Sequence, residues 1–445
     1  MSRPPTLAVW LEYLETLHPK AIAMGLDRVR AVHMRMHAAL TCATVTVTGT
    51  NGKGSTCAML ATMLGAGGFR VGLYTSPHLA RYNERVRIDG REATDDELVA
   101  ALNAVEDARV ATPAGDGAPT LLTYFEFGTL AALWLFARSE LDVVILEVGL
   151  GGRLDAVNIA DADVAVVTSV DFDHMDYLGP TRDDIGGEKA GIFRAGQPVV
   201  CAEPKPPKTL TDHAFALGAP ITQIGRDYGF VPEGGQWQYW GPGGRRSGLP
   251  YPALRGSHQL ANAATALAVL DILRPRLPVS AGAIRDGLLT LELSGRFQVL
   301  PGRPIVVLDV AHNPHAARAV AATLGTMGFS PQTHAVLGML SDKDISGVIE
   351  SIKARIDDWF IATLPGPRGA TAARLHAELL HAGVAPSAIR TFDDAAAAFR
   401  AARESAGEAD RILVFGSFLT VAAALAVTVP ASGMPATPAT TLPHG

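Results

Sequence analysis

The segment Gly49-Thr50-Asn51-Gly52-Lys53-Gly54-Ser55-Thr56 decides the fold of this chain, because it joins a β-branched run, 44–48, to a predicted helix. Glycines let backbone N–H groups converge on phosphate oxygens, a helix N-terminus adds positive potential, and Lys53 supplies a full charge. The segment is not a standard Walker A loop, since Val47 stands where that pattern has Gly and Gly54 follows the lysine. A glycine-rich turn without a ligand is the alternative. Strand, lysine and helix together favour a nucleotide phosphate site.

Short β-branched runs alternate with helical segments on both sides of this loop, which predicts parallel strands joined by crossover helices. The first block has predicted strands at 44–48, 71–75, 142–147 and 164–168, and predicted helices at 10–17, from Ser55, 127–137 and 260–273. Between them, the Gly- and Trp-rich stretch 221–256 is typical of β-hairpins. The second block has predicted strands at 305–309, 335–338, 359–363, near 389 and at 412–415, and predicted helices at 315–324, 345–356, 372–381, 394–403 and from Phe418.

The chain is therefore expected to be an α/β protein of two domains, divided near Ser294-Gly295. Residues 1–294 are predicted to form a P-loop-like ATPase domain with a mostly parallel sheet and a hairpin insertion. Residues 295–427 are predicted to form a doubly wound α/β domain. The Pro-, Thr- and Ala-rich residues 428–445 are expected to be a disordered tail.

Composition excludes several classes of protein. The 445 residues include 38 Lys and Arg against 44 Asp and Glu, so a net charge of −6 argues against nucleic acid or an anionic membrane as the main partner. Cys42, Cys57 and Cys201 lie far apart, which predicts neither a disulfide framework nor a zinc site and favours a cytoplasmic location. The N-terminus shows no apolar signal core. The uncharged stretch 412–429 is better explained by a buried strand and helix than by a membrane span.

A family resemblance rests on motifs spread over most of the chain. The Gly between Lys53 and Ser55 resembles the Mur-type ligases, and the whole loop resembles their folate-tailoring members. Further motifs occur in the family's order: Thr75-Ser76-Pro77-His78-Leu79, Tyr82-Asn83-Glu84-Arg85, Thr123-Tyr124-Phe125-Glu126, 146–155, 173–179, 188–192, 262–265, Gly295-Arg296-Phe297 and 309–314. From Leu14 to about Leu425 the chain resembles the bacterial bifunctional dihydrofolate synthase/folylpolyglutamate synthases.

This resemblance implies an ATP-dependent ligase that joins L-glutamate to dihydropteroate and adds further glutamates to reduced folates. A carboxylate is a poor electrophile, so ATP must first convert it to an acyl phosphate, which the amine of glutamate then attacks. The implied partners are ATP, L-glutamate, dihydropteroate and reduced folates, with no nucleic acid and no membrane, and a monomer is expected.

Three alternatives remain open from the sequence. A monofunctional folylpolyglutamate synthase would share these motifs. A cell-wall Mur ligase carries an extra N-terminal domain, and only about 43 residues precede the first predicted strand here. A nucleotide switch or binding module would keep the phosphate loop but would have no need for Glu147, His174 and Lys189.

Glu147 ends an apolar strand. At this position of a doubly wound sheet a side chain points into the ligand crevice. The alternative is a carboxylate at the strand end that only forms a salt bridge. The resemblance implies that Ser76 and Glu147 bind the Mg²⁺ on the triphosphate, that His174 belongs to a second Mg²⁺ site, and that Lys189 is carbamylated and acts as an oxygen ligand. Without the resemblance, Glu188-Lys189 reads as a pair of surface charges. Lys53, Glu147, His174 and Lys189 are thus the expected catalytic residues.

Nucleotide contacts are expected from both domains. The resemblance assigns the triphosphate to the loop from Gly49 to Ser55, the adenine to Asn262, and further contacts from the second domain to Arg296, Asp309 and His312. Asp309 ends a predicted strand, again at the edge where ligands collect. For His312 the alternative is a hydrogen bond at the N-terminus of the next helix.

The resemblance also assigns the folate site, to Ile22, Ala23, Met24, Pro77, His78, Thr123, Phe125, Leu154, Asp155 and Ala156. One position departs from the family pattern, because many relatives have Asp where this chain has Ala23. Alanine has no carboxylate to offer a pterin, so the resemblance does not carry over that carboxylate contact.

Overall fold

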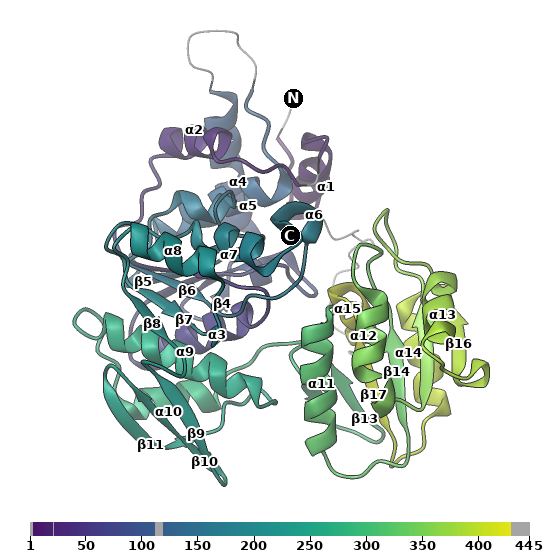
Figure 1. The fold of residues 1–445 in the computed structure, drawn as a ribbon. Helices are drawn as coiled ribbons and strands as arrows, with labels where there is room; N and C mark the ends of the chain where they lie inside the picture. Colours follow the sequence, from purple (N-terminus) through teal and green to yellow (C-terminus); the bar gives the residue numbers. More distant parts are fainter. Residues whose placement is uncertain (1–2, 21, 112–118, 429–445) are drawn as a thin grey trace. The chain divides into compact units, whose positions relative to one another are not determined.

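The computed structural model describes residues 3–20, 22–111 and 119–428 (Figure 1). Within them the chain forms two compact units. The first holds residues 3–253 and 260–291, and the second holds 254–259 and 292–428. Except for Thr428, the predicted tail 428–445 lies outside the described residues.

The first unit is built on an eight-stranded sheet in the order β4-β3-β2-β5-β1-β6-β7-β8. β3 and β4 are antiparallel at one edge, and the other strands are parallel. Every residue of β1 and β5 is buried, as expected for parallel strands covered on both faces. The strands are β1 (Ala43–Thr48), β2 (Val71–Tyr74), β3 (Val86–Ile88), β4 (Arg91–Glu92), β5 (Val143–Glu147), β6 (Val164–Val167), β7 (Val199–Cys201) and β8 (Ile221–Gln223).

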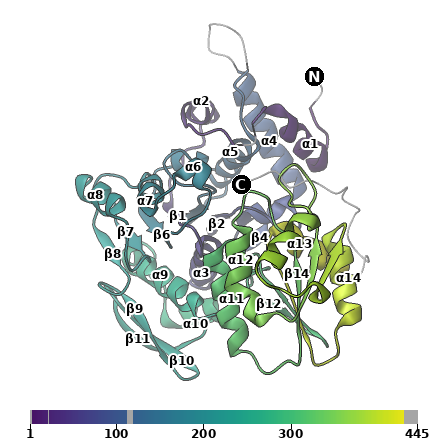
Figure 2. The same cartoon turned by 45° about the vertical axis from the view of Figure 1, so that its right-hand side comes forward.

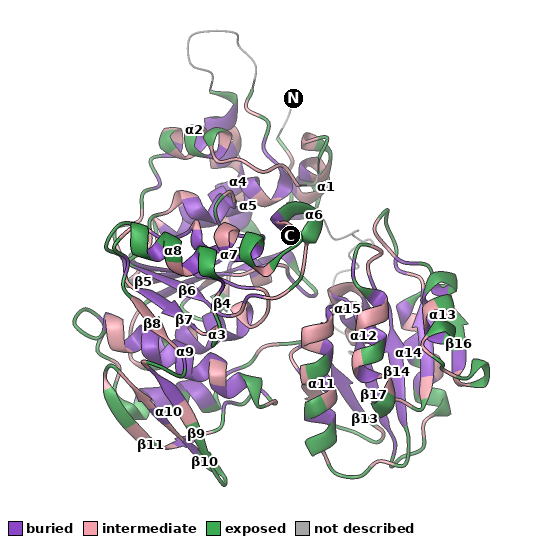
Figure 3. Ribbon diagram, in the orientation of Figure 1, coloured by how far each residue is buried: buried purple, intermediate pink, exposed green. Residues whose placement is uncertain are grey.

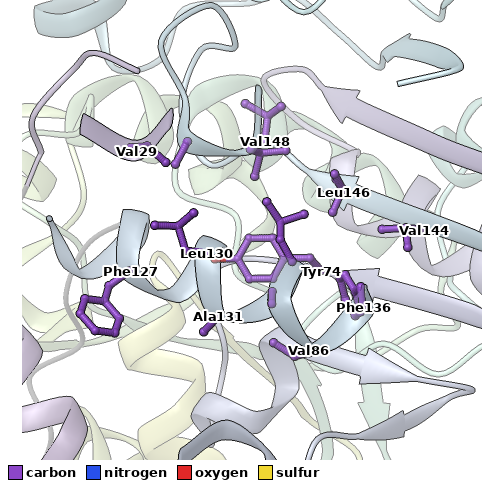
Figure 4. Packing of buried hydrophobic residues seen from close by; sticks show 14 of the residues in the cluster. Val29, Tyr74, Val86, Phe127, Leu130, Ala131, Phe136, Val144, Leu146 and Val148 are labelled. Carbon is purple, nitrogen blue, oxygen red and sulfur yellow. The ribbon is translucent and has the colours of Figure 1, made fainter. Parts of the chain in front are cut away.

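Helices cover this sheet. α3 (Lys53–Ala66) packs on β1, β2 and β5, and α10 (Ala281–Leu289) packs on α3, where Gly287 lies against Met63. On the side of α5 (Tyr124–Phe136), Figure 4 shows Tyr74 of β2 between Leu130 of α5 and Leu146 of β5, in one buried cluster. The remaining helices of this unit are α1 (Leu7–Leu17), α2 (Asp27–Met36), α4 (Asp95–Val110), α5 (Tyr124–Phe136), α6 (Met175–Leu178), α7 (Arg182–Ala190), α8 (Lys208–Ala216) and α9 (His258–Leu273), with the 3₁₀ turns η1 (Tyr82–Arg85) and η2 (Ala156–Ile159).

The predicted hairpin insertion is a separate antiparallel sheet of β9 (Gly229–Glu233), β10 (Gln236–Gly241) and β11 (Gly244–Pro250), which lies beside α9 and α10 (Figure 2). Asp271 of α9 anchors it, with no exposed side-chain surface. Its carboxylate accepts hydrogen bonds from Tyr239 Oη at 2.6 Å, the Gly243 amide at 2.9 Å and Arg246 Nη2 at 2.5 Å.

The second unit has a six-stranded sheet in the order β12-β13-β17-β14-β15-β16, parallel except for β12. Figure 3 shows its strands buried and the outer faces of its helices exposed. The strands are β12 (Gln298–Leu300), β13 (Ile305–Leu308), β14 (Thr333–Leu337), β15 (Asp358–Ala362), β16 (Ile389–Phe392) and β17 (Arg411–Phe415). The helices are α11 (Pro314–Thr326), α12 (Ile345–Ile352), α13 (Ala372–His381), α14 (Ala395–Ser405) and α15 (Phe418–Thr428), with η3 (Lys353–Arg355) and η4 (Pro386–Ala388).

The predicted fold class is confirmed: both units are α/β, with mostly parallel sheets. The uncharged stretch 412–429 forms β17 and then α15, and none of the helices in the described ranges is long and apolar enough to cross a membrane. One predicted helix, 345–356, is shorter than expected, because α12 ends at Ile352 and a 3₁₀ turn follows.

We predict that Asp271→Ala destabilises the first unit by about 3 kcal/mol, because it leaves the Arg246 charge and two further donors without their acceptor. Thermal denaturation followed by circular dichroism should show a fall of several degrees in Tm. Asp212→Ala is the matched control, since Asp212 is exposed and pairs only with Lys208 one helical turn away. Equal Tm values for the two variants would contradict the anchoring role.

Candidate active site

The candidate site of the first unit lies at the carboxyl edge of four neighbouring strands, β2, β5, β1 and β6. The register is fixed: Val47 of β1 pairs with Glu147 of β5, Thr48 pairs with Val167 of β6, and Tyr74 of β2 pairs with Leu146. The segments that follow these strands therefore emerge side by side. Ligands of open α/β sheets collect at this edge.

The loop after β1 is held by the end of β6. Thr168 Oγ1 and Ser169 Oγ donate to the carbonyl of Asn51 at 2.7 and 3.0 Å, and Ser169 Oγ accepts from the Asn51 amide at 2.9 Å. Gly49 has φ +149°, and a Cβ there would lie 1.9 Å from Thr168 Oγ1. Glycine is therefore required at this position by both conformation and space.

Lys53 begins α3 and folds back over the loop, where its Nζ donates to the Gly49 carbonyl at 2.9 Å. The residue before the helix, Gly52, offers no side-chain cap to the first amides of α3. A Cβ on Gly52 would lie 2.6 Å from Asn262 Oδ1 of α9. The structure thus brings Asn262 to the loop, and the loop has the amides and the charge that bind phosphate.

Glu147 and Ser76 form a buried pair beside this loop. Glu147 ends β5, is 4% exposed, and accepts a hydrogen bond from the Ser76 amide at 3.0 Å. The hydroxyl of Ser76 is also buried but has no hydrogen-bond partner. A buried hydroxyl without a partner is uncommon, and this one has its hydrogen-bonding capacity available to a bound ligand.

Lys189 lies in the last turn of α7 and is 3% exposed, so the interpretation of Glu188-Lys189 as a surface pair is wrong for the lysine. Burial, together with the charge of Lys53 and against the opposing charge of Asp173, lowers the pKa of Lys189 to about 7. Glu188 does face outward enough to pair with Arg153 at 2.7 Å. The sequence pattern did not predict the burial of Lys189, because the apolar face of α7 is short.

His174 immediately precedes the short helix α6, with φ +51°. Its Nε2 lies 3.9 Å from Asp173 Oδ1, and its amide donates to the same oxygen at 2.9 Å. The charge of Asp173 raises the pKa of Lys189 against the effect of its burial. The loop after β6 therefore presents an imidazole and a carboxylate near a buried amine.

The predicted folate residues gather around the start of α5. Thr123 caps α5, and the Thr123 amide donates a hydrogen bond to Glu126 Oε2 at 2.8 Å. Phe125 packs against Gly149, where a Cβ would lie 2.7 Å from its ring. Asp155 accepts hydrogen bonds from the amides of Leu150 and Val157, at 2.8 and 2.9 Å, and burial raises its pKa to about 6.

The segment Ile22-Ala23-Met24 joins this group through Arg28. Arg28 pairs with Glu126 at 2.5 Å and also donates to the carbonyl of Ala23. Ile22 and Met24 pack against the core of the first unit. The segment therefore offers backbone groups and apolar side chains, while Ala23 has no carboxylate to offer a ligand.

In the second unit, Arg296, Asp309 and His312 lie together beyond the carboxyl end of β13. Asp309 accepts from the amides of Phe297 and Ala311 at 2.8 and 2.7 Å, and burial raises its pKa against the opposing charges of Arg296 and His312. His312 Nδ1 contacts the Val310 carbonyl at 2.8 Å. Asn313, not His312, caps α11.

Three residues of the first unit were missed from the sequence. Thr168 and Ser169 hold the phosphate loop, and Asp173 lies near Lys189. The available signal was their place after a predicted strand, since polar residues directly after a buried strand gather at the ligand edge. What the sequence did not reveal is that β6 pairs with β1.

No cluster of three or more His, Cys, Asp and Glu side chains that could hold a metal occurs within residues 3–20, 22–111 and 119–428. A Mg²⁺ site here would need other oxygen donors. The Ser76 hydroxyl and the Glu147 carboxylate are hard oxygen ligands of the kind that Mg²⁺ prefers, and Mg²⁺ commonly takes its remaining ligands from phosphates and water. The residues present therefore fit such an ion.

Comparison with known families gives two matches. Residues 47–203 match the Mur ligase middle domain, and residues 295–418 match the Mur ligase glutamate ligase domain. The dihydrofolate synthase/folylpolyglutamate synthase of Escherichia coli is 48% identical over 417 residues, which cover 94% of each chain.

Solved structures resemble the chain along its whole length. The structure of E. coli FolC in complex with DHPP and ADP has a TM-score of 0.87 and 46% identity, covering 95% of this chain and 97% of that one. A bifunctional folylpolyglutamate synthase/dihydrofolate synthase with Mn, AMPPNP and L-glutamate bound has a TM-score of 0.85 and 47% identity, with the same coverage.

We predict that Lys53→Ala lowers kcat about 100-fold, because the cation that would neutralise a transferring phosphoryl group is lost. ADP release at saturating Mg²⁺-ATP measures the effect. Lys205→Ala, at an exposed lysine of the same unit, is the control and should retain normal turnover. A near-normal kcat for Lys53→Ala would mean that the loop is only structural.

Proposed function

Because the chain belongs to the Mur ligase family, in the branch of the bacterial dihydrofolate synthase/folylpolyglutamate synthases, we propose that its site performs ATP-dependent glutamylation of folates. It is a carbon–nitrogen ligase that joins L-glutamate to dihydropteroate, giving dihydrofolate, and adds glutamates to reduced folates. ATP phosphorylates the carboxylate, and the amine of glutamate displaces phosphate from the acyl phosphate.

The observation that carries this function is the placement of Lys53, Ser76 and Glu147 at one sheet edge. Phosphoryl transfer requires positioning and charge neutralisation more than covalent catalysis. The loop amides and Lys53 can hold the triphosphate, while the group around Thr123, Phe125 and Asp155 is assigned to the folate. The carboxylate to be activated can then lie between the two.

We assign the divalent metal to Ser76 and Glu147, with a second Mg²⁺ position near His174. A divalent ion bound there supplies charge neutralisation on the phosphate oxygens. The carboxylate of Glu147 is held by the Ser76 amide, so its free electron pairs are oriented before any ion binds. Manganese in a similar structure supports a divalent site.

We propose that Lys189 carries a carbamate, which turns a buried cation into an anionic oxygen group. CO₂ reacts only with a neutral amine, and burial together with Lys53 favours the neutral form of Lys189. A carbamate beside Lys53 would also replace repulsion between two cations with attraction.

The remaining nucleotide contacts are assigned to Asn262 of the first unit and to Arg296, Asp309 and His312 of the second. The assignment of Asn262 to the nucleotide is supported by the closeness of its side chain to Gly52. The three residues of the second unit are supported by their common place beyond β13.

We further propose a cytoplasmic monomer. Cys42, Cys57 and Cys201 are all unpaired thiols, which suits a reducing compartment. Mass measurement in solution would test the monomer.

A paired assay tests the ligase activities. We expect ADP release and a product larger by one glutamate with dihydropteroate, and again with tetrahydrofolate. Omitting glutamate or the pterin substrate should abolish ADP release. Product with tetrahydrofolate alone would restrict the enzyme to folylpolyglutamate synthesis, and ATP turnover that is indifferent to both substrates would reject the ligase function.

The carbamate has its own test. Protein incubated with ¹³C-bicarbonate should show a carbamate carbon resonance that is absent from Lys189→Met, and wild-type activity should fall when CO₂ is removed from the buffer. Lys343→Met, at a lysine of the second unit, should keep the resonance. Activity independent of bicarbonate together with no carbamate signal would exclude the modification.

A further inference from the structure

A buried arginine lies behind the loop that follows β2. Arg85, the last residue of η1, is 1% exposed. It forms no ion pair with any residue that the structure describes, and its Nη2 is buried without a hydrogen-bond partner. Burying an unpaired guanidinium costs free energy of folding, so its presence in the fold points to a functional role.

The contacts of Arg85 join three elements. Its Nε donates to His78 Nδ1 at 2.8 Å, and its guanidinium lies 5.5 Å from the ring centre of Tyr82 and 5.6 Å from that of Tyr124. Its carbonyl accepts from the Thr75 amide at 2.9 Å. Arg85 therefore ties the loop carrying Ser76 and His78 to the first turn of α5, where the folate residues begin.

The hydrogen bond from Arg85 decides which nitrogen of His78 carries a proton. A guanidinium can only donate, so Nδ1 must accept with its lone pair, and the ring proton lies on Nε2. Nε2 then is a donor, and it makes no hydrogen bond to another described residue. Two residues earlier in the same loop, Ser76 Oγ also lacks a partner. One loop thus carries two polar atoms that can hydrogen-bond to a ligand.

We propose that Arg85 is a positioning residue that fixes His78 so that Nε2–H donates a hydrogen bond to an oxygen of the folate substrate. The inference rests on the proposed function, since it needs a folate beside this loop. The charge of Arg85 behind the ring strengthens the donor, which favours an anionic acceptor. A carboxylate oxygen of the substrate is therefore the expected acceptor, and a pterin carbonyl is the other source of the same chemistry.

A double-mutant cycle tests the linkage between Arg85 and His78. Arg85→Lys keeps the charge but places a methylene where Nε was, and His78→Phe removes the donor. Each variant should weaken the Kd for dihydropteroate, measured by calorimetry with ADP present, about 10-fold. The double variant should bind no more weakly than His78→Phe, because Arg85 acts only through that ring.

Independent effects that multiply to about 100-fold in the double variant, or single variants that bind normally, would overturn the proposal. Arg85→Met is a second variant, in case Arg85→Lys does not fold, and the same non-additivity is expected. The Kd for ADP should stay within about 2-fold throughout, which separates this role from general loss of structure. Arg87→Met, at a partly exposed arginine of β3, is the matched control.

The acceptor is identified with a dihydropterin that lacks the carboxyl group. If His78→Phe weakens only the ligand with the carboxylate, that group is the acceptor, whereas equal weakening of both ligands identifies the pterin carbonyl. The proposed function fails separately, if the wild-type protein forms no glutamylated product. A wild-type enzyme that ligates glutamate but shows no coupling between Arg85 and His78 would reject the positioning role alone.

Discussion

Parallel pairing of β1 with β5 on one side and β6 on the other is the constraint on which the first unit depends. This register places Val47 opposite Glu147 and brings Thr168, directly after β6, against the loop at Asn51. A slip of one residue would turn each side chain to the other face of the sheet. The phosphate loop, the Glu147 carboxylate and the loop with His174 would then no longer meet.

Electrostatics around this edge explain how a protein with a net charge of −6 can be assigned anionic substrates. The charge of Lys53 lowers the pKa values of Lys189, Asp155 and Cys57, so all three groups lie in the electric field of this one cation. In a site shielded from water, a single cation acts much more strongly than the distant surface charges. The overall charge therefore says little about partners, and the placement of a few cations decides what binds.

Each unit uses the same physical device. In the first, the loops after β2, β5, β1 and β6 carry the assigned groups. In the second, Asp309 follows β13 and is held by the amides of Phe297 and Ala311. Rigid buried strands thus carry loops whose polar atoms are left for ligands, as with Ser76 Oγ. The apolar runs of the sequence, including 412–415, form buried strands of these two sheets.

The fold class, the loop around Lys53, and the place of Glu147 and Asp309 at strand ends could be predicted from the sequence, because periodicity, glycines and strand boundaries are local properties. Its motifs also indicated the family. The packed fold was needed to show that Lys189 is buried and that Thr168 and Ser169 hold the loop. It was also needed to show that Asn262 reaches Gly52 and that Arg85 lies behind His78. These contacts join residues far apart in the chain or depend on the packing of whole elements, and burial is a property of the packed fold and not of a single residue's neighbours in sequence.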